Sequence, residues 1–402
     1  MRTFTAFLYE ETTEDKLKHL EHPEDHPIKS GEPGFHHAFN TLKTTAEALQ
    51  GHNTGTRLMT KYDGAPSVVF GHHPETGKFF VASKSAFNKD PKLNYTEADI
   101  ERNHGHAPGL VSKLKAALKH LPKVAPKAGV FQGDFLYNKA DNDVQEDGKG
   151  GYSFKPQLIQ YHAPKGSPQA AKIARAKMGF YVHTGYRGNT LENMKADYTP
   201  DTSGFRQSAD VHMHHWHEGF DPKKAKYSEQ EHNTFKNEMN KAADVFKNSD
   251  RHGMFGAASG MDPEHLSTYI NRSVVNGATP TVQGLAQHVQ ARHQKGIDSV
   301  KTEKAKATKQ QAMQADLAHI AKNKQHFANL LQMHQHLQTA KNALLPALAR
   351  GDTTGYKYSI NGQPSTAEGT VAVTKENRPT KFINRGSGGF AQANLSKGGF
   401  KK

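Results

Sequence analysis

The most constraining feature of this sequence is a change of pattern that later reverses. Between residues 57 and 186, short apolar runs alternate with turn residues, which is typical of strands. From about residue 228 to residue 350, Ala, Gln, His and Lys recur with a period near 3.6, which predicts helices. Strand patterns then return at 356–360, 369–374 and 380–384. We therefore predict an α+β fold, an antiparallel-sheet domain with a large basic α-helical insertion.

The same pattern divides the 402 residues into five segments. They are an N-terminal helical extension (1–56), the first part of the sheet domain (57–220), the basic helical insertion (221–352), the second part of the sheet domain (353–385) and a Gly-rich tail (386–402). In the extension, the prolines and glycine between 23 and 33 predict a loop before a helix at 35–49. The tail has two interpretations, contact with single-stranded nucleic acid or disorder, and its composition favours disorder.

Individual elements can be placed inside the first part of the sheet domain. Apolar runs predict strands at 57–61, 67–71, 78–84, 129–137, 158–161 and 179–186. A His-Pro-Glu-Thr-Gly turn separates the second and third of these runs, so they form an antiparallel hairpin. Leucines at helical spacing predict a helix over 109–121.

The charge of the chain favours an anionic partner. The formal net charge is +14, and residues 223–350 hold 18 Lys or Arg against 10 Asp or Glu. Such an excess attracts polyanions, nucleic acid above all, although a charge-decorated helical bundle that mediates assembly has the same composition. The absence of cysteine excludes disulfides, thiolate zinc sites and cysteine nucleophiles. No apolar run approaches the length of a membrane span, so we predict a soluble, cytoplasmic protein without a membrane partner.

A lysine at the end of a predicted strand is the first candidate for chemistry. Lys61 opens the tetrapeptide Lys61-Tyr62-Asp63-Gly64, which lies between two apolar runs. A lysine amine is a nucleophile only after it loses a proton, so its pKa must fall below the usual value of about 10.4. We expect partial burial and neighbouring cations to lower it. The alternative is an ordinary lysine beside an Asp-Gly turn.

The order of this and later motifs resembles the covalent nucleotidyltransferase superfamily, which comprises ATP-dependent DNA and RNA ligases and mRNA-capping enzymes. Lys61-Tyr62-Asp63-Gly64 is similar to motif I of that superfamily. The resemblance implies an ATP-grasp-like ligase adenylylation domain. It also implies that Lys61 attacks the α-phosphate of ATP to give lysyl-AMP, with Thr60, Asp63 and Gly64 in the nucleotide site.

Two further segments before the helical region carry the same resemblance. Ser83-Lys84-Ser85 looks like the segment in which RNA ligases place a basic residue, here Lys84, against substrate phosphate. Phe131-Gln132-Gly133-Asp134-Phe135 is similar to motif III, in which Asp134 stands for a glutamate that contacts the ribose or a metal-bound water.

The adenine platform and the metal ligand complete the set. Gly179-Phe180-Tyr181-Val182-His183 resembles motif IIIa, whose aromatic residue packs on adenine, and either Phe180 or Tyr181 can serve. Glu368-Gly369 looks like motif IV, whose glutamate holds Mg²⁺ together with Asp134.

The last motif departs from the superfamily pattern. Lys381 matches one of the two lysines of motif V, which neutralise phosphates, but Ile383 stands where the second is expected. Lys375 lies nearby in the sequence and is a candidate substitute. Two other departures are the helical segment before Glu368 and the short stretch after Lys381, which is too short for a C-terminal OB-fold domain. The insertion then becomes the candidate surface for nucleic-acid contacts.

These resemblances predict an ATP-dependent polynucleotide ligase that uses ATP and Mg²⁺, or Mn²⁺, to join nucleic-acid ends. RNA is favoured over DNA because Pro66 and Ser67 occupy the place of an arginine that DNA ligases carry. Two alternatives remain open: guanylyl transfer from GTP, and a degenerate fold that binds nucleic acid or serves as a phage structural protein. The opening, Met1 to Glu10, looks like the start of many tailed-phage proteins, which suits end repair in a host cytoplasm.

A histidine run is the remaining candidate for metal binding. His212, His214, His215 and His217 lie within six residues. Imidazoles at such spacing can close a metal site, but no carboxylate accompanies them at a suitable spacing. We therefore predict a cluster that faces solvent or phosphate.

Overall fold

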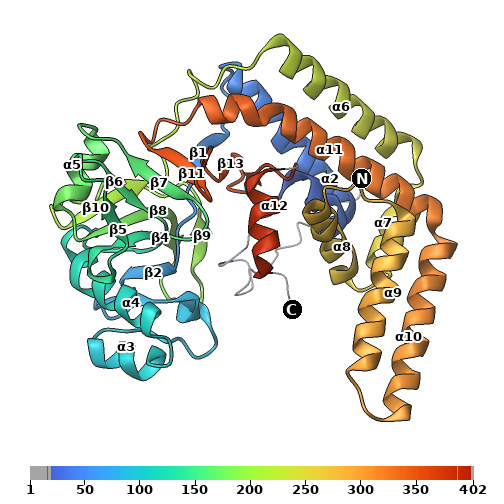
Figure 1. Ribbon diagram of the computed structural model, residues 1–402, viewed down its shortest axis with the longest axis horizontal. Helices are drawn as coiled ribbons and strands as arrows, with labels where there is room; N and C mark the ends of the chain where they lie inside the picture. Colours follow the sequence, from blue (N-terminus) through green and yellow to red (C-terminus); the bar gives the residue numbers. More distant parts are fainter. Residues whose placement is uncertain (1–15, 17–19, 387, 400–402) are drawn as a thin grey trace, which may run out of the picture.

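The computed structural model of the chain describes residue 16 and residues 20–386 and 388–399. Figure 1 shows a sheet-rich lobe and a helical lobe side by side, with α12 (Phe390–Asn394) between them. The described part contains eleven α-helices and three sheets, in which all strand pairs but one are antiparallel. The α+β class with antiparallel sheets is thus confirmed. The expectation drawn from Met1 to Glu10 lies outside the described residues.

A six-stranded sheet forms the centre of the first lobe. Its strands are β2 (Ser67–His72), β3 (Phe79–Ala82), β4 (Val130–Asn138), β8 (Met178–Arg187), β9 (Lys195–Asp197) and β10 (Val211–His215). Their order is β10-β8-β4-β2-β3, with β9 on β8 and with β10 parallel to β8. Helices α3 (Glu97–His104) and α4 (Pro108–His120) lie at this lobe, and the leucine face of α4 packs into the core of the sheet.

A second sheet joins strands from both ends of the chain. Its order is β12 (Gln363–Ser365), β11 (Lys357–Ile360), β7 (Gln160–Ala163), β6 (Tyr152–Phe154) and β5 (Val144–Glu146). α5 (Pro168–Arg175) follows β7. Because β11 pairs with β7, strands that precede and follow the helical region belong to one sheet.

A third sheet joins the two lobes. In it, β13 (Gly369–Val373) lies between β1 (Arg57–Lys61) and β14 (Pro379–Phe382). Side chains alternate across these strands. Leu58, Ala372 and Phe382 face the core of the helical lobe, whereas Met59, Val371 and Val373 form a cluster on the opposite face.

The helical lobe is built around one long helix, α11 (Lys324–Arg350). The helices before it are α6 (Glu229–Asn248), α7 (Arg251–Ser259), α8 (Pro263–Asn276), α9 (Val282–Asp298) and α10 (Glu303–Lys322). α2 (His26–Leu49) packs against α11 and α7, so the N-terminal helix and the helices after residue 228 share one hydrophobic core.

The N-terminal prolines do not form the predicted loop. A short 3₁₀ turn covers Pro23–Asp25, and α2 already begins at His26. The helix is interrupted only at Gly31, whose φ of 60° lies in the left-handed region that glycine tolerates. Pro33 then starts the second helical stretch, where a missing N–H does no harm.

The predicted disorder of the Gly-rich tail is wrong for residues 388–399. Residues 390–394 form α12, and a π-helical turn follows at Leu395–Gly399. Phe390 and Ala391 are buried, and the Gln392 amide donates to the Val275 carbonyl of α8. Burial of an aromatic side chain supplies the stabilisation that a purely polar, glycine-rich tail lacks.

The histidine run agrees with its prediction only in part: His217 is exposed and His215 is half-buried, but the other two histidines lie in the core. His212 and His214 lie on one face of β10 and are buried. His212 Nδ1 is 3.2 Å from the Tyr137 hydroxyl, and His214 Nε2 is 3.1 Å from the Tyr356 hydroxyl. Burial lowers the pKa of both imidazoles, so they are neutral polar members of the core rather than a phosphate-facing cluster.

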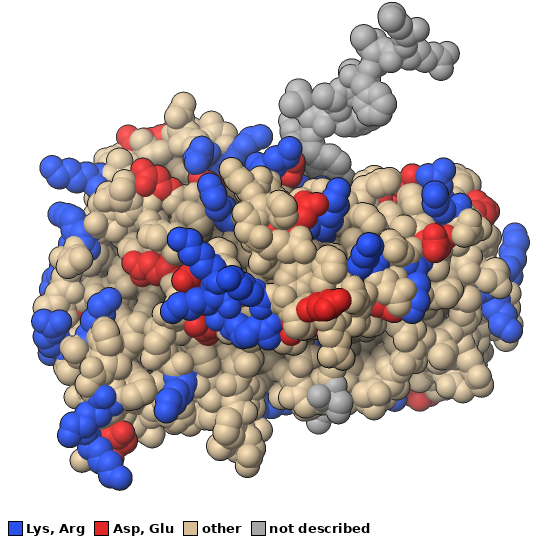
Figure 2. All heavy atoms as spheres, turned by 90° about the horizontal axis from the view of Figure 1, so that it is seen from above, with Lys and Arg blue, Asp and Glu red and all other residues tan. Residues whose placement is uncertain are grey.

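The charge of the surface is not confined to the helical lobe. On the face shown in Figure 2, Lys and Arg side chains are spread along the whole molecule, with one denser group near the middle and with Asp and Glu between them. Among the residues that the structure describes, no helix is long and apolar enough to cross a membrane.

Candidate functional site

A cavity of about 500 Å³ lies between the three-stranded sheet and the six-stranded sheet. Eight of the ten residues proposed from the motifs line it: Lys61, Asp63, Gly64, Lys84, Asp134, Tyr181, Glu368 and Lys381. They come from segments that are more than 300 residues apart in the chain. The cavity is of the size that holds a nucleotide-like molecule.

Strand pairing brings Lys61 to Glu368. Lys61 ends β1 and pairs with Gly369, the first residue of β13, so the preceding residue, Glu368, lies beside the lysine. Lys61 Nζ donates to Glu368 Oε2 at 2.7 Å. The two side chains are 25% and 8% exposed, so the pair lies at the wall of the cavity with limited access to water.

The environment of Lys61 reverses the predicted shift of its pKa. Burial disfavours the ammonium, but the carboxylates of Glu368, Asp134 and Asp63 outweigh burial and raise the pKa of Lys61. The expectation of a lowered pKa assumed partial burial and cationic neighbours. Burial is present, but the expectation is wrong because the closest charge is a carboxylate.

The turn after Lys61 is fixed by backbone contacts. Asp63 Oδ2 accepts hydrogen bonds from the N–H groups of Leu158 and Ile159, at 2.7 and 2.8 Å. A Cβ on Gly64 would lie 2.7 Å from the Cβ of Asp134 and 2.9 Å from the Phe135 carbonyl oxygen. Glycine at this position therefore allows the turn to lie directly against β4, which carries Asp134.

Asp134 faces the cavity from the middle of the six-stranded sheet. It pairs with Ser67 of β2 and Tyr181 of β8, and its Oδ1 is 3.5 Å from His183 Nε2. Burial disfavours its carboxylate, but His183 and Lys61 overcome that effect and lower the pKa of Asp134. Asp134 is consequently an anion at neutral pH.

The alternation of side chains along β8 decides between the two aromatic candidates, Phe180 and Tyr181. Tyr181 lines the cavity, and its hydroxyl donates to the Thr60 carbonyl at 3.3 Å. Phe180 points to the opposite face of β8, where it is fully buried against Phe70 and Phe135. Phe180 is thus a core residue and does not reach the cavity.

Thr60 is the other predicted residue that lies outside the cavity. It precedes Lys61 on β1, so its side chain points to the opposite face of the three-stranded sheet. There its Oγ1 donates to the Gly219 carbonyl at 2.7 Å.

Two predicted lysines add positive charge to the cavity. Lys84 lines it from the start of a 3₁₀ turn, Lys84–Phe87. Lys381 pairs with Val371 and lies on the same face of the sheet. Burial and the charge of Lys61 lower the pKa of Lys381 to about 8.

The structure supplies no second lysine of motif V at the predicted places. Ile383 is buried in the core next to the five-stranded sheet. Lys375 lines a different hollow, near His52 and Thr54, and its nearest carboxylate is Glu376, so it does not substitute for the missing residue.

Several residues of the cavity were not predicted. His183 follows Tyr181 by two positions, and strand alternation could have placed both on one face. Phe390 and Asn394 of α12 also line the cavity, and the charge of Lys397 acts on Asp63. No local pattern in the sequence indicates that the tail returns to this site.

The donor atoms fit a hard divalent cation beside a phosphate chain. Glu368 and Asp134 offer carboxylate oxygens, the ligands that Mg²⁺ prefers, and both lie on the wall of one cavity. Lys61, Lys84 and Lys381 offer ammonium groups for phosphate oxygens, and Tyr181 offers an aromatic ring. These are the types of group that bind Mg²⁺ and phosphate oxygens.

The fold and the cavity together define an α+β protein with a polar site between two sheets. The chain belongs to a family of unknown function, DUF6267, whose model matches residues 16–398. No curated protein and no solved structure matched the chain.

Proposed function

We propose that the chain is an ATP-dependent polynucleotide ligase-like nucleotidyltransferase that acts through a lysyl-AMP intermediate. The observation that carries the proposal is the convergence of Lys61, Asp134, Glu368 and Lys381 on one cavity, from strands before and after the helices. The order of these residues in the chain resembles that of the nucleotidyltransferase superfamily, and their proximity is what that chemistry requires.

In the proposed first step, the neutral Lys61 amine attacks the α-phosphorus of ATP. A nitrogen–phosphorus bond forms, the bond from that phosphorus to the bridging oxygen breaks, and pyrophosphate leaves. Lys381 and Lys84 are placed to bind phosphate oxygens, and Tyr181 to stack on the base. AMP then passes to the 5′-phosphate of a nucleic acid, and a 3′-hydroxyl displaces it during sealing.

The proton of Lys61 is the main obstacle to this step. Glu368 Oε2 accepts a hydrogen bond from Lys61 Nζ at 2.7 Å and favours the ammonium form of the lysine. Mg²⁺ held by Glu368 and Asp134 would neutralise these carboxylates and thereby favour the neutral amine. Lys381, which is half-buried and positively charged below about pH 8, acts in the same direction.

A labelling experiment tests the proposal. We expect that the full chain, incubated with Mg²⁺ and ATP labelled at the α-phosphate, carries an acid-labile label after denaturation. Labelled GTP under the same conditions distinguishes the guanylyl alternative, and a chase with 5′-phosphorylated RNA or DNA identifies the acceptor. If neither nucleotide labels the chain, the covalent mechanism is wrong.

One observation favours the second candidate, a degenerate fold that binds nucleic acid. The place of the second motif V lysine is taken by buried Ile383, and Lys375 is directed elsewhere. A chain that binds ATP and nucleic acid but never becomes labelled would have this function. The labelling and binding measurements therefore separate the two candidates.

The pKa of Lys381 predicts how nucleotide binding depends on pH. Below about pH 8 the lysine is charged, and above it the charge that binds phosphate is lost. We expect the affinity for an ATP analogue whose α–β bridge cannot be cleaved, measured with Mg²⁺, to fall as the pH rises above that value, by at most about tenfold per pH unit. Titration calorimetry between about pH 6.5 and pH 9.5 measures this change.

Lys381→Arg is the matched control for the pH dependence, because arginine keeps its charge over this range. We expect its affinity to be constant across the same titration. An equal fall in the variant would assign the titration to another group and overturn the role of Lys381.

A further inference from the structure

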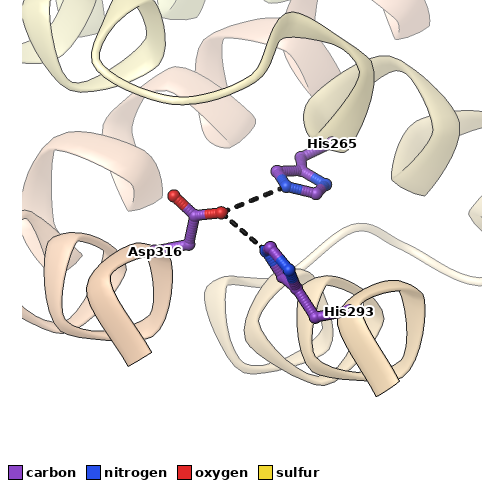
Figure 3. Close-up of side chains that lie close together, drawn as sticks. All are labelled: His265, His293 and Asp316. Carbon is purple, nitrogen blue, oxygen red and sulfur yellow. Dashed lines mark hydrogen bonds and ion pairs between the residues drawn. The ribbon is translucent and has the colours of Figure 1, made fainter. Parts of the chain in front are cut away.

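Three helices of the second lobe place metal-ligating side chains at one point. His265 comes from α8, His293 from α9 and Asp316 from α10 (Figure 3). In the part of the chain that the structure describes, they form the one group of at least three such residues whose ligand atoms all lie within 4.8 Å of one another. This point is separate from the cavity at Lys61, whose lining includes none of the three.

The two distances from Asp316 to the imidazoles are close to those in a tetrahedral site, and all three ligand atoms lie within 4.8 Å of one another. Asp316 Oδ2 lies 3.3 Å from His265 Nε2 and 2.7 Å from His293 Nε2. Atoms bound at 2.0–2.2 Å to one tetrahedral ion are about 3.4 Å apart. The first distance already matches this separation, and the second requires an opening of less than about 1 Å.

We propose that His265, His293 and Asp316 bind one divalent transition-metal ion, for which Zn²⁺ fits the two imidazole nitrogens and one carboxylate oxygen. Three protein ligands leave a fourth position for water or for a group of a partner. The donor set differs from the all-oxygen set that Mg²⁺ prefers, so this ion is distinct from the one in the proposed nucleotide site.

The burial of the three side chains suits such an ion. The side chain of His265 is 6% exposed, whereas those of His293 and Asp316 are 17% and 24% exposed, which leaves a path for entry.

The packing of these helices gives the ion a structural purpose. α9 and α10 extend away from the body of the helical lobe as an antiparallel pair (Figure 1). Among the described side chains of α10, only Ile320 is buried, so few apolar contacts hold this helix. An ion shared by α8, α9 and α10 would cross-link the pair to the lobe.

Metal titration tests the proposal. The full chain, made without a histidine tag and freed of metal with a chelator, is titrated with Zn²⁺ alone and, in parallel, with Co²⁺, whose visible absorption reports tetrahedral coordination. We expect one equivalent to bind and the unfolding temperature to rise. Asp316→Asn and His293→Gln should each weaken binding at least about 100-fold and remove the rise.

His336→Gln is the matched control. His336 has the same 17% side-chain exposure as His293 and lies 2.7 Å from one carboxylate, that of Glu238, but no second imidazole completes its group among the described residues. The His336→Gln variant should bind Zn²⁺ as the parent does.

The Asp316→Asn variant also separates loss of the metal from loss of the fold. Its new amide oxygen can still accept hydrogen bonds from the imidazoles, so the unfolding temperature without metal shows whether this variant is folded. The proposal is overturned if the parent does not bind Zn²⁺. It is also overturned if folded Asp316→Asn binds Zn²⁺ as tightly as the parent does.

Discussion

Lys61→Arg is expected to abolish covalent labelling by ATP, reducing it by at least about a thousandfold. The guanidinium keeps a positive charge beside Glu368, which in the parent accepts a hydrogen bond from Lys61 Nζ at 2.7 Å. It cannot lose a proton near neutral pH, so it cannot act as the nucleophile. Lys61→Ala removes the nucleophile as well, but it also leaves the buried Glu368 without its partner. The arginine variant therefore isolates the chemical role of the amine.

Lys78→Ala is the control that shows whether removal of a lysine outside the cavity changes the labelling. Lys78 is exposed in the turn before β3 and does not line the cavity, so its variant should be labelled like the parent. Labelling is measured after denaturing electrophoresis, and binding of unreacted ATP is measured separately by calorimetry. Undiminished label in folded Lys61→Arg would place the adduct on another residue and refute the proposed nucleophile.

The strands around this lysine could be predicted because their signals are local. Residues 57–61 were predicted as a strand, and β1 has those bounds. The hairpin of β2 and β3 was predicted from its turn and is also confirmed. In both cases an apolar run is bounded by residues that favour turns, so no distant contact is needed to recognise the element.

The direction of side chains was harder to predict because both faces of a strand can be buried. β8 is buried along nearly its whole length, so hydrophobic alternation does not tell whether Phe180 or Tyr181 faces the cavity. Along β1, successive side chains point to opposite faces of the sheet. Thr60 and Lys61 are neighbours on this strand, so the sequence alone indicates that their side chains cannot both line one cavity.

Electrostatic neighbours depended on contacts that no local pattern reveals. The pKa of Lys61 was predicted to be lowered by partial burial and by cations, but the pairing of β1 with β13 places the Glu368 carboxylate beside it. The position of α12 beside the cavity was equally hard to predict. It depends on the burial of Phe390 against residues near α8 and the five-stranded sheet, which are distant in the sequence. Such pairings are set by the tertiary fold and not by the composition of the tail.

Lys341→Met is expected to lower the free energy of unfolding by about 3 kcal/mol, the low end of the cost of breaking a buried ion pair, because Arg385 Nη1 remains 3.6 Å from Glu24 Oε1. Lys341 Nζ on α11 donates to Glu24 Oε1 at 2.5 Å, and both side chains are fully buried. Asp25 beside it accepts from Arg385 at 2.7 Å and lies 3.1 Å from His334 Nε2. Methionine has a similar length but no charge, so the variant mainly removes the ion pair.

The double variant Lys341→Met, Glu24→Gln separates the charge from the packing. A neutral amide at position 24 no longer needs a cation, so we expect the double variant to regain more than half of the lost stability. Chemical denaturation measures both changes. A single variant as stable as the parent would show that the pair contributes nothing, whereas a double variant no more stable than the single one would assign the loss to packing.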